Sequence, residues 1–433
     1  MKTVIILLML TLLPLCVCAA NTQWGKLSDM DYDEVCAKTF VVPQVKRISG
    51  AIDPNGIPGK VMCGYQGWFA AEGDGYGRGW YHYQGGRGFN PSSLTIDMWP
   101  DTSEYKELYP TDFKNPDGST AGIFSSLDLS TSRLHFSWMR QYSIDGVYLQ
   151  RFVGEIAGRD GLYHNNIVLH NARIAANEYG RVISITYDFS GQGRELVDNV
   201  KKDWMRLVDD ARLTRDPAYL RQNGKPVVEL WGVGFNDNRR YTIEDCIELV
   251  DWLHNDPKYG GCYVVIGVPD GWREQNRDCI KSAAMTEVLD KADCISPWAV
   301  GRFGSIREFS DWALAKARAD YEWCVKRGKI FMPVVFPGFT WHNMNPDSPL
   351  NSIPRQKGTF LQAQYRGHAS YGAVCAYQAM FDEIDEGTAI FKVTNRPPTG
   401  NGAVFADLEG MPSDTYLKIV REGKRLIQRN VKK

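Results

Sequence analysis

Short runs of apolar residues alternate along this chain with stretches whose apolar positions recur at helical spacing. Continuous apolar strands separated by helices are typical of a parallel sheet with both faces covered. The strand-like runs lie at 61–69, 146–152, 182–188, 226–232, 263–268, 294–298, 330–336 and 373–381. Helical patterns lie at 130–142, 165–178, 195–213, 242–254, 306–326, 360–367 and 413–429. This alternation, with eight strand-like runs, predicts an α/β fold of the (β/α)8 TIM-barrel type.

An open, doubly wound sheet is the alternative arrangement for such runs. That fold usually carries a glycine-rich phosphate loop between its first strand and the next helix. The glycines at 73–77 are not followed by a helical pattern, so they do not predict such a loop. We therefore favour the barrel.

Further segments lie on either side of the first strand-like run: an N-terminal part before it and a long interval after it. Residues 1–20 carry Lys2, then an apolar stretch and small residues, which predicts a secretory signal peptide rather than a membrane span. We expect 21–58 to be a short N-terminal extension and 59–430 to be a single barrel. The interval between the first two runs is unusually long, and we expect it to lie over the catalytic face. The mature protein is predicted to be secreted, periplasmic or on the cell surface, and lipid anchoring through Cys16 or Cys18 is less favoured.

Charge and aromatic content narrow the class of partner. The formal net charge of -1 over 433 residues gives no reason to expect nucleic acid or an anionic membrane. The chain has 13 Trp and 21 Tyr, whose rings stack on sugars but also build ordinary cores. A carbohydrate is therefore a plausible substrate, while the oligomeric state stays open.

The cysteines do not predict a metal site, because no close pair has ligand spacing. Cys63 and Cys375 lie within apolar runs and are expected to be buried thiols. Since export permits disulfides, pairing is open for a set of four in the second half of the chain: Cys246, Cys262, Cys279 and Cys294. We expect neither a cofactor nor a metal.

Four carboxylates follow the eighth strand-like run directly: Asp382, Glu383, Asp385 and Glu386. Desolvated like charges raise one another's pKa, which suits carboxylates to acid/base catalysis. Two other interpretations are a helix cap with a solvated acidic turn and a structural calcium site. We favour the catalytic one, because other strand ends also carry polar residues.

The carboxyl ends of barrel strands build the active site, so the residues there are the site candidates. Asp188 ends the third run and is the candidate nucleophile, base or charge stabiliser, with helix capping as its alternative. Glu383 or Glu386 is the candidate general acid, tuned by Asp382 or Asp385. The candidate substrate-binding residues are Tyr65, Gln66, Trp68, Gln150, Arg151, Glu229, Trp231, Trp298, Trp341 and His342.

Some of these candidates also have structural interpretations. Glu229 lies within a buried run, where an unpaired acid is costly, so we expect it to pair with a residue such as Arg151. His342 lies in a loop rich in Pro and Asn and could be an ordinary loop residue.

Paired carboxylates with aromatic rings and amides suit glycosidic bond cleavage, in which one acid protonates the leaving oxygen while the other attacks or activates water. No Gly-x-Ser-x-Gly elbow marks a serine hydrolase. The sequence therefore predicts a secreted glycoside hydrolase acting on an oligo- or polysaccharide. The alternative is a barrel that binds glycans without cleaving them.

Three blocks resemble a known group of proteins: 64–69, 144–152 and 381–388, the last ending in Glu386-Gly387-Thr388. They resemble the (β/α)8 proteins of glycoside hydrolase families 71 and 99, some of which are described as xylosidase/arabinosidase. The resemblance implies a barrel glycosidase for α-linked glycans, since family 71 cleaves α-1,3-glucan and family 99 cleaves α-mannosides internally. At 187–194 Asp188 is the one carboxylate, so the resemblance supplies no pair of glutamates there. The sugar, the linkage, the stereochemical outcome and endo or exo action stay open.

Overall fold

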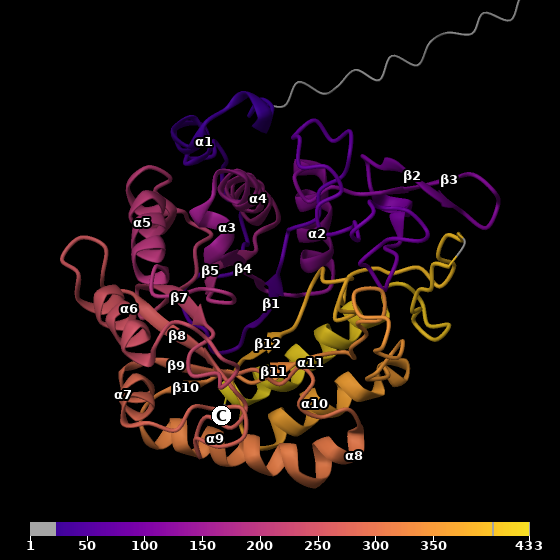
Figure 1. The fold of residues 1–433 in the computed structure, drawn as a ribbon. Helices are drawn as coiled ribbons and strands as arrows, with labels where there is room; N and C mark the ends of the chain where they lie inside the picture. The colour runs from indigo at the N-terminus through magenta and orange to yellow at the C-terminus, as the bar shows by residue number, and fades with distance from the viewer. Residues whose placement is uncertain (1–22, 401, 433) are drawn as a thin grey trace, which may run out of the picture.

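The computed structural model describes residues 23–400 and 402–432, so the predicted signal peptide at 1–20 lies outside the described residues. Parallel strands form one curled sheet in the order β10-β9-β8-β7-β5-β4-β1-β12-β11 (Figure 1). Their bounds are β1 (Val61–Tyr65), β4 (Gly146–Phe152), β5 (Val182–Asp188), β7 (Lys225–Trp231), β8 (Tyr263–Val268), β9 (Cys294–Pro297), β10 (Ile330–Phe331), β11 (Val334–Val335) and β12 (Ala376–Gln378). Each contains one of the predicted strand-like runs or part of it.

The seventh run closes the sheet into a barrel. Its first half, β10, pairs with β9, and its second half, β11, pairs with β12. Between the halves, Met332 N donates to Ile295 on the β9 side, and the Pro333 carbonyl accepts from Tyr377 on the β12 side. Because Pro333 has no N–H to donate, the ladder breaks there while the chain continues. The predicted (β/α)8 barrel is confirmed.

Helices surround the sheet on its outside (Figure 1). The principal ones are α2 (Leu129–Gln141), α4 (Arg159–Tyr179), α5 (Leu196–Asp209), α6 (Ile243–Asn255), α7 (Ala283–Lys291), α9 (Leu314–Lys326), α10 (Thr359–Ser370) and α11 (Thr415–Val431). Shorter elements are α1 (Tyr32–Thr39), α3 (Val153–Ala157), α8 (Ile306–Glu308), the π-helical η4 (Phe309–Ala313), β6 (Arg221–Gln222) and the 3-10 turns η1 (Leu27–Asp29), η2 (Thr102–Glu104), η3 (Leu213–Arg215) and η5 (Gln356–Gly358). The sequence pattern missed α7, which is short and buries only Met285, Val288 and Leu289.

Side chains alternate between the inside and the outside of the barrel. One apolar cluster fills the barrel interior and includes Met62, Tyr148, Val227, Val265 and Tyr377. The other cluster lies between the sheet and the helices. On each strand it takes the residues that alternate with the inward-facing ones: Val61, Cys63, Val147, Leu149, Ile183, Ile185, Val228 and Leu230. Since successive strand residues point to opposite faces of the sheet, only the strand-end side chains on its inner face reach the barrel mouth.

The long segment after β1 is ordered. It contains the antiparallel hairpin of β2 (Tyr109–Lys114) and β3 (Thr120–Ile123) and a group of aromatic rings around Phe89, Trp99 and Phe113. Isolated bridges from Met98 to Ala406 and from Pro100 to Val393 join it to the segment that follows β12. It therefore forms one wall above the barrel together with the C-terminal part of the chain.

The N-terminal extension also packs on the barrel helices. Asn166 of α4 donates to Thr39 at the end of α1, and Val35 and Cys36 of α1 are buried. No helix in the described part of the chain has the length and apolar character needed to cross a bilayer.

The described cysteines are all free and buried. Cys63 and Cys375 are buried thiols as predicted. The pairing left open for the four cysteines of the second half does not occur, because the structure holds all four as free thiols.

Candidate active site

A pocket of about 280 Å³ opens at the carboxyl end of the barrel. It is lined by Gln66, Trp68, Gln150, Phe152, Asp188, Ser190, Trp231, Trp298, Met380, Glu383 and Glu386. These residues end or follow β1, β4, β5, β7, β9 and β12, so strands from most of the barrel contribute. The structure thus brings together many of the candidates: Gln66, Trp68, Gln150, Asp188, Trp231, Trp298, Glu383 and Glu386.

Glu383 is held by hydrogen bonds to both of its oxygens. Gln66 Nε2 donates to Glu383 Oε1 over 2.7 Å, and the Thr388 hydroxyl donates to Oε2. Burial, followed by the charge of Asp385, raises the pKa of Glu383. The carboxyl group therefore has a fixed orientation and a bias toward its protonated form.

Glu386 differs from Glu383, because no hydrogen bond or ion pair fixes its carboxylate within the described residues. Its backbone carbonyl accepts from Thr340 N, which anchors the main chain beside the pocket. Burial raises the pKa of Glu386 well above its ordinary value, and the charges of Glu383, Asp385 and Asp188 add to the shift. Its side chain is partly exposed in the pocket, so a ligand can reach a carboxyl group that tends to keep its proton.

Asp188 reaches the same pocket from another wall. β4 and β1 separate its strand, β5, from β12 in the sheet order. Its Oδ1 accepts from Ser190 N over 2.7 Å, and burial raises its pKa to about 6. No helix begins at Ser190, because α5 starts only at Leu196, so helix capping is not its role.

The other two acids of the cluster lie behind the pocket. Asp382 is fully buried and accepts from the backbone N–H groups of Gln66 and Gly67, each over 2.8 Å. Asp385 is also buried and lies 3.4 Å from His82 Nδ1 through its Oδ2. Burial raises the pKa of Asp382 to about 7. Asp382 holds the two strand ends together and, unlike Glu383 and Glu386, does not line the pocket.

The cluster is not a solvated turn. Its acids are largely buried and no helix starts there. Among residues 23–400 and 402–432, no group of three or more His, Cys, Asp or Glu side chains is placed to hold a metal ion.

Two candidate substrate-binding residues point away from the pocket. The Tyr65 hydroxyl lies 2.8 Å from His135 Nδ1, within the layer between sheet and helices. Arg151 donates to Asp203 of α5 through its Nε over 2.9 Å, and to Asn166 of α4. The alternation of strand side chains explains both corrections, because the neighbours Gln66 and Gln150 take the inward positions.

Glu229 lies inside the barrel, beneath the pocket. It accepts from the Thr186 hydroxyl over 2.5 Å and does not pair with Arg151 as expected. Burial, with a smaller contribution from Asp188, raises its pKa to about 7. Glu229 does not line the pocket.

Trp341 and His342 lie in the loop after β11 and do not line the pocket either. His342 N and Asn343 N both donate to the buried carboxylate of Asp97, which belongs to the long segment after β1. The His342 side chain lines a separate groove with residues 85–94. The loop geometry set by Asp97 thus turns these two residues away from the acids.

Aromatic rings form two sides of the pocket. Trp68 stacks on His82 with ring centroids 3.9 Å apart and also packs on Phe152. Trp231 meets Trp298 edge to face at 5.3 Å. Sequence reasoning missed Phe152 and His82. The period of two from Gln150 predicts that Phe152 faces inward, whereas no local pattern marks His82.

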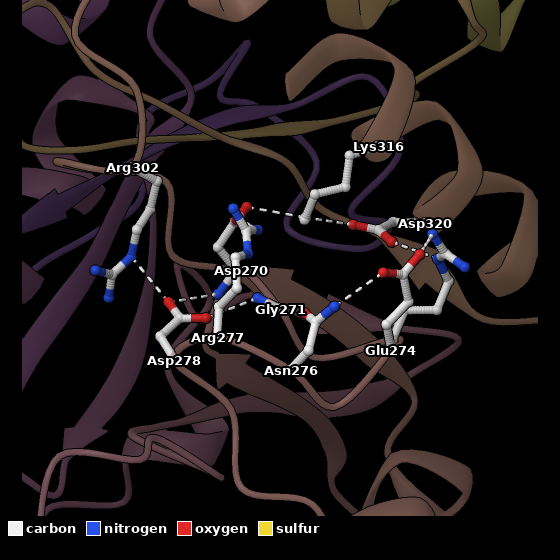
Figure 2. Close-up of polar contacts among 10 residues, drawn as sticks. Asp270, Gly271, Glu274, Asn276, Arg277, Asp278, Arg302, Lys316 and Asp320 are labelled. Atoms are coloured by element: carbon white, nitrogen blue, oxygen red, sulfur yellow. Dashed lines mark hydrogen bonds and ion pairs between the residues drawn. The ribbon is translucent and has the colours of Figure 1, made fainter. Parts of the chain in front are cut away.

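A charged cavity of about 300 Å³ lies between the loop after β8 and α9 (Figure 2). Its charges are paired with one another: Asp270 lies 2.9 Å from Lys316, and Arg273 lies 2.7 Å from Asp320. Arg302 likewise pairs with Asp278 at its edge. Because these groups already satisfy one another, the cavity offers no free acid or base, in contrast to the barrel mouth.

The fold is similar to those of solved glycoside hydrolase structures. A family 99 endo-α-mannosidase from Bacteroides thetaiotaomicron, solved alone and with bis-tris-propane, is 15% identical, with a TM-score of 0.62 over 87% of this chain and 100% of that one. A protein described as glycoside hydrolase-like is 14% identical, with a TM-score of 0.50 over 76% of this chain and 94% of that one. No protein-family model matches this chain, and no curated protein matches it. The similarity to a family 99 barrel is thus confirmed as a similarity of fold.

Proposed function

We propose that this protein is a glycoside hydrolase that cleaves an oligo- or polysaccharide in the pocket at the barrel mouth. The observation that carries the proposal is the convergence of Asp188, Glu383 and Glu386 on one pocket that also presents tryptophan rings and amides. Two carboxyl groups flanking a sugar bond are the usual requirement for its hydrolysis. The fold similarity to glycoside hydrolases supports the same conclusion.

Glu386 is the proposed proton donor. Its raised pKa keeps a proton available near neutral pH, and its carboxyl group is not committed to another side chain. A positioned acid of this kind protonates the leaving oxygen as the glycosidic bond breaks.

Asp188 is the proposed second carboxylate, acting as nucleophile, base or charge stabiliser. It reaches the sugar from a wall other than that of Glu386, and its pKa of about 6 leaves it substantially ionised at neutral pH. Glu383 holds Gln66 in place by accepting its amide hydrogen bond, and its raised pKa biases it toward the protonated form beside Glu386. Together the three acids can supply a proton on one side of a sugar bond and negative charge on the other.

The aromatic residues are the proposed sugar platforms. Trp68, Trp231 and Trp298 present large apolar faces around the acids, and Gln150 is fixed by donating to the Tyr377 hydroxyl over 2.8 Å. Sugar rings have apolar faces that pack on aromatic rings and hydroxyl edges that bond to amides. We further propose, from the apolar start of the sequence, that the mature enzyme acts outside the cytoplasm.

The test is reducing-sugar release by the protein from Asn21 onward against α- and β-linked polysaccharides and aryl glycosides. α-Mannans belong in the panel because the similar Bacteroides structure is named an endo-α-mannosidase. Product formation that is lost in folded Asp188→Asn and Glu386→Gln variants would support the proposal. Binding of a polysaccharide without product from any substrate would instead identify a glycan-binding barrel.

A further inference from the structure

A cavity of about 230 Å³ adjoins the pocket of the candidate active site. The two cavities share Gln66, Trp68, Gln150, Phe152 and Ser190 as walls. The adjoining cavity extends past the end of β4 toward α4, where Leu149 and Val168 line it. It is therefore a side pocket of the barrel mouth that reaches into the layer between sheet and helices.

The inner end of this side pocket is apolar. Leu149 and Val168 belong to the core between sheet and helices, and Trp68 and Phe152 add aromatic carbon. Gly67 lets the backbone after β1 lie close to Val168, because a Cβ at position 67 would lie 2.5 Å from Val168 Cγ1. A hydroxyl-bearing sugar ring pressed against this surface would leave its hydroxyl groups without partners, which is unfavourable. A small apolar substituent suits the inner end better.

Three side chains of the pocket wall carry buried polar atoms without a partner in the described structure: Trp68 Nε1, His164 Nδ1 and Gln66 Oε1. The Trp68 atom can only donate a hydrogen bond, and the Gln66 oxygen can only accept one. These three atoms are almost wholly covered, so a small turn of each side chain has to bring them to the pocket surface. A ligand that then pairs them gains free energy, because buried polar groups are rarely left unpaired.

His164 is an acceptor at its free nitrogen. Its Nε2 lies 2.7 Å from the Gly67 carbonyl oxygen, so Nε2 carries the hydrogen and donates. Burial lowers the pKa of His164 to about 3, which keeps the ring neutral at working pH. Nδ1 is then a lone-pair acceptor, so the three unpartnered atoms comprise one donor and two acceptors beside the apolar end. Glu155 also lines the pocket, and its carboxylate is already bonded to Arg78 and to the Tyr81 hydroxyl.

We propose that this side pocket receives the acetamido group of an N-acetylated sugar bound in the barrel mouth. The amide N–H donates to His164 Nδ1 or Gln66 Oε1, the amide oxygen accepts from Trp68 Nε1, and the methyl group packs on Leu149 and Val168. A hydroxyl group in the same place supplies no methyl group, and a free amine would bring a charge against the apolar end, where it is desolvated. The inference rests on the proposed function only in that the sugar ring itself occupies the mouth pocket.

The test is isothermal titration of the protein with N-acetyl-D-glucosamine and N-acetyl-D-galactosamine, each compared with the parent sugar and with the free amino sugar. One added hydrogen-bonded contact and a buried methyl group are expected to give the N-acetylated forms about tenfold or more tighter binding. Asn165 of α4 also lines the side pocket, so Asn165→Phe is expected to fill it and to remove this preference. Equal affinity for all forms, or an unchanged preference in a folded Asn165→Phe protein, overturns the proposal.

Asn255→Phe is the matched control. Asn165 Nδ2 donates to the Gly161 carbonyl four residues earlier, and Asn255 Nδ2 donates in the same way to Asp251, each over 2.9 Å. The control loses the same helix contact but is expected to keep the preference. Asn165→Leu replaces the phenylalanine variant if that protein does not fold.

Because binding is measured without turnover, the two proposals fail separately. A preference for N-acetylated sugars in a protein that hydrolyses nothing retains the side-pocket proposal and refutes the glycosidase. Hydrolysis of unsubstituted glycans with no such preference refutes the side-pocket proposal and retains the glycosidase.

Discussion

Gln66 Nε2 donates a 2.7 Å hydrogen bond to Glu383 Oε1, across 317 residues of sequence. Gln66 follows β1 and Glu383 follows β12, and these strands are neighbours in the sheet through pairs such as Cys63 and Gln378. Asp382 strengthens the same junction by accepting from the backbone of Gln66 and Gly67. Closure of the barrel therefore sets the orientation of a candidate catalytic carboxyl group.

The roles proposed for the two glutamates predict different outcomes when each is neutralised. Glu386→Gln should lower kcat by about 10²–10⁴-fold, the usual contribution of an acid catalyst. It should barely change the melting temperature, because no partner of its carboxylate is lost. Glu383→Gln should lower both activity and melting temperature, since it disturbs the contacts with Gln66 and Thr388. Initial rates and thermal melts check both, with exposed Glu287→Gln as the control.

Asp188→Asn should abolish turnover while leaving the fold intact. The change removes the charge but keeps the oxygen that accepts from Ser190 N. Asp270→Asn is a useful comparison, because Asp270 also follows a barrel strand but is paired with Lys316 and Arg277. It should lower stability slightly and keep activity. Near-normal rates in the Asp188 variant would refute the assignment.

Glu229 should make stability depend on pH. Burial raises its pKa from 4.5 to about 7, so between these values the folded protein holds a proton that the unfolded chain has released. Its contribution to the free energy of unfolding therefore falls as pH rises through this window. Relative to Glu229→Gln, the native protein should lose up to about 3 kcal/mol between pH 4 and pH 8. Urea unfolding of both proteins at several pH values measures this difference, and parallel pH profiles would contradict it.

Arg151 should matter for stability through Asp203. Removing the guanidinium in Arg151→Met leaves the Asp203 carboxylate buried with the Tyr187 hydroxyl as its remaining close partner. Breaking a buried pair in this way costs about 3–5 kcal/mol. Arg133→Met, which breaks an exposed pair with Glu178, should cost about 1 kcal/mol or less. Chemical denaturation distinguishes the two, and a similar cost for both would show that Arg151 is not structurally important.

Reducing agents should leave the melting temperature unchanged. The described cysteines are free thiols, and burial raises the pKa of Cys246 and of Cys262, so their thiols stay protonated and unreactive. Thermal melts with and without dithiothreitol check this, and a large drop in the presence of reductant would reveal a disulfide.

The sequence alone was sufficient to predict the barrel and several residues of its mouth. Apolar runs separated by amphipathic helices determine a parallel sheet with both faces covered. The carboxyl ends of such strands build the active site, so acids at those ends, such as Asp188 and Glu386, are predicted to lie there. Even so, α7 was missed, because a short helix with three buried residues leaves a weak pattern.

Only the tertiary structure decided which of these residues face the pocket. Tyr65 and Gln66 are adjacent, as are Gln150 and Arg151, yet one of each pair points inward and the other into the helix layer. The alternation of side chains along a strand can be read from the sequence. Which of the two alternating sets faces the barrel interior depends on how the strands pair. Partners such as Arg151 and Asp203, Asp385 and His82, or Asp97 and His342 come from segments far apart in the chain. These contacts form only when the barrel closes, and no local pattern of residues encodes which side chains it brings together.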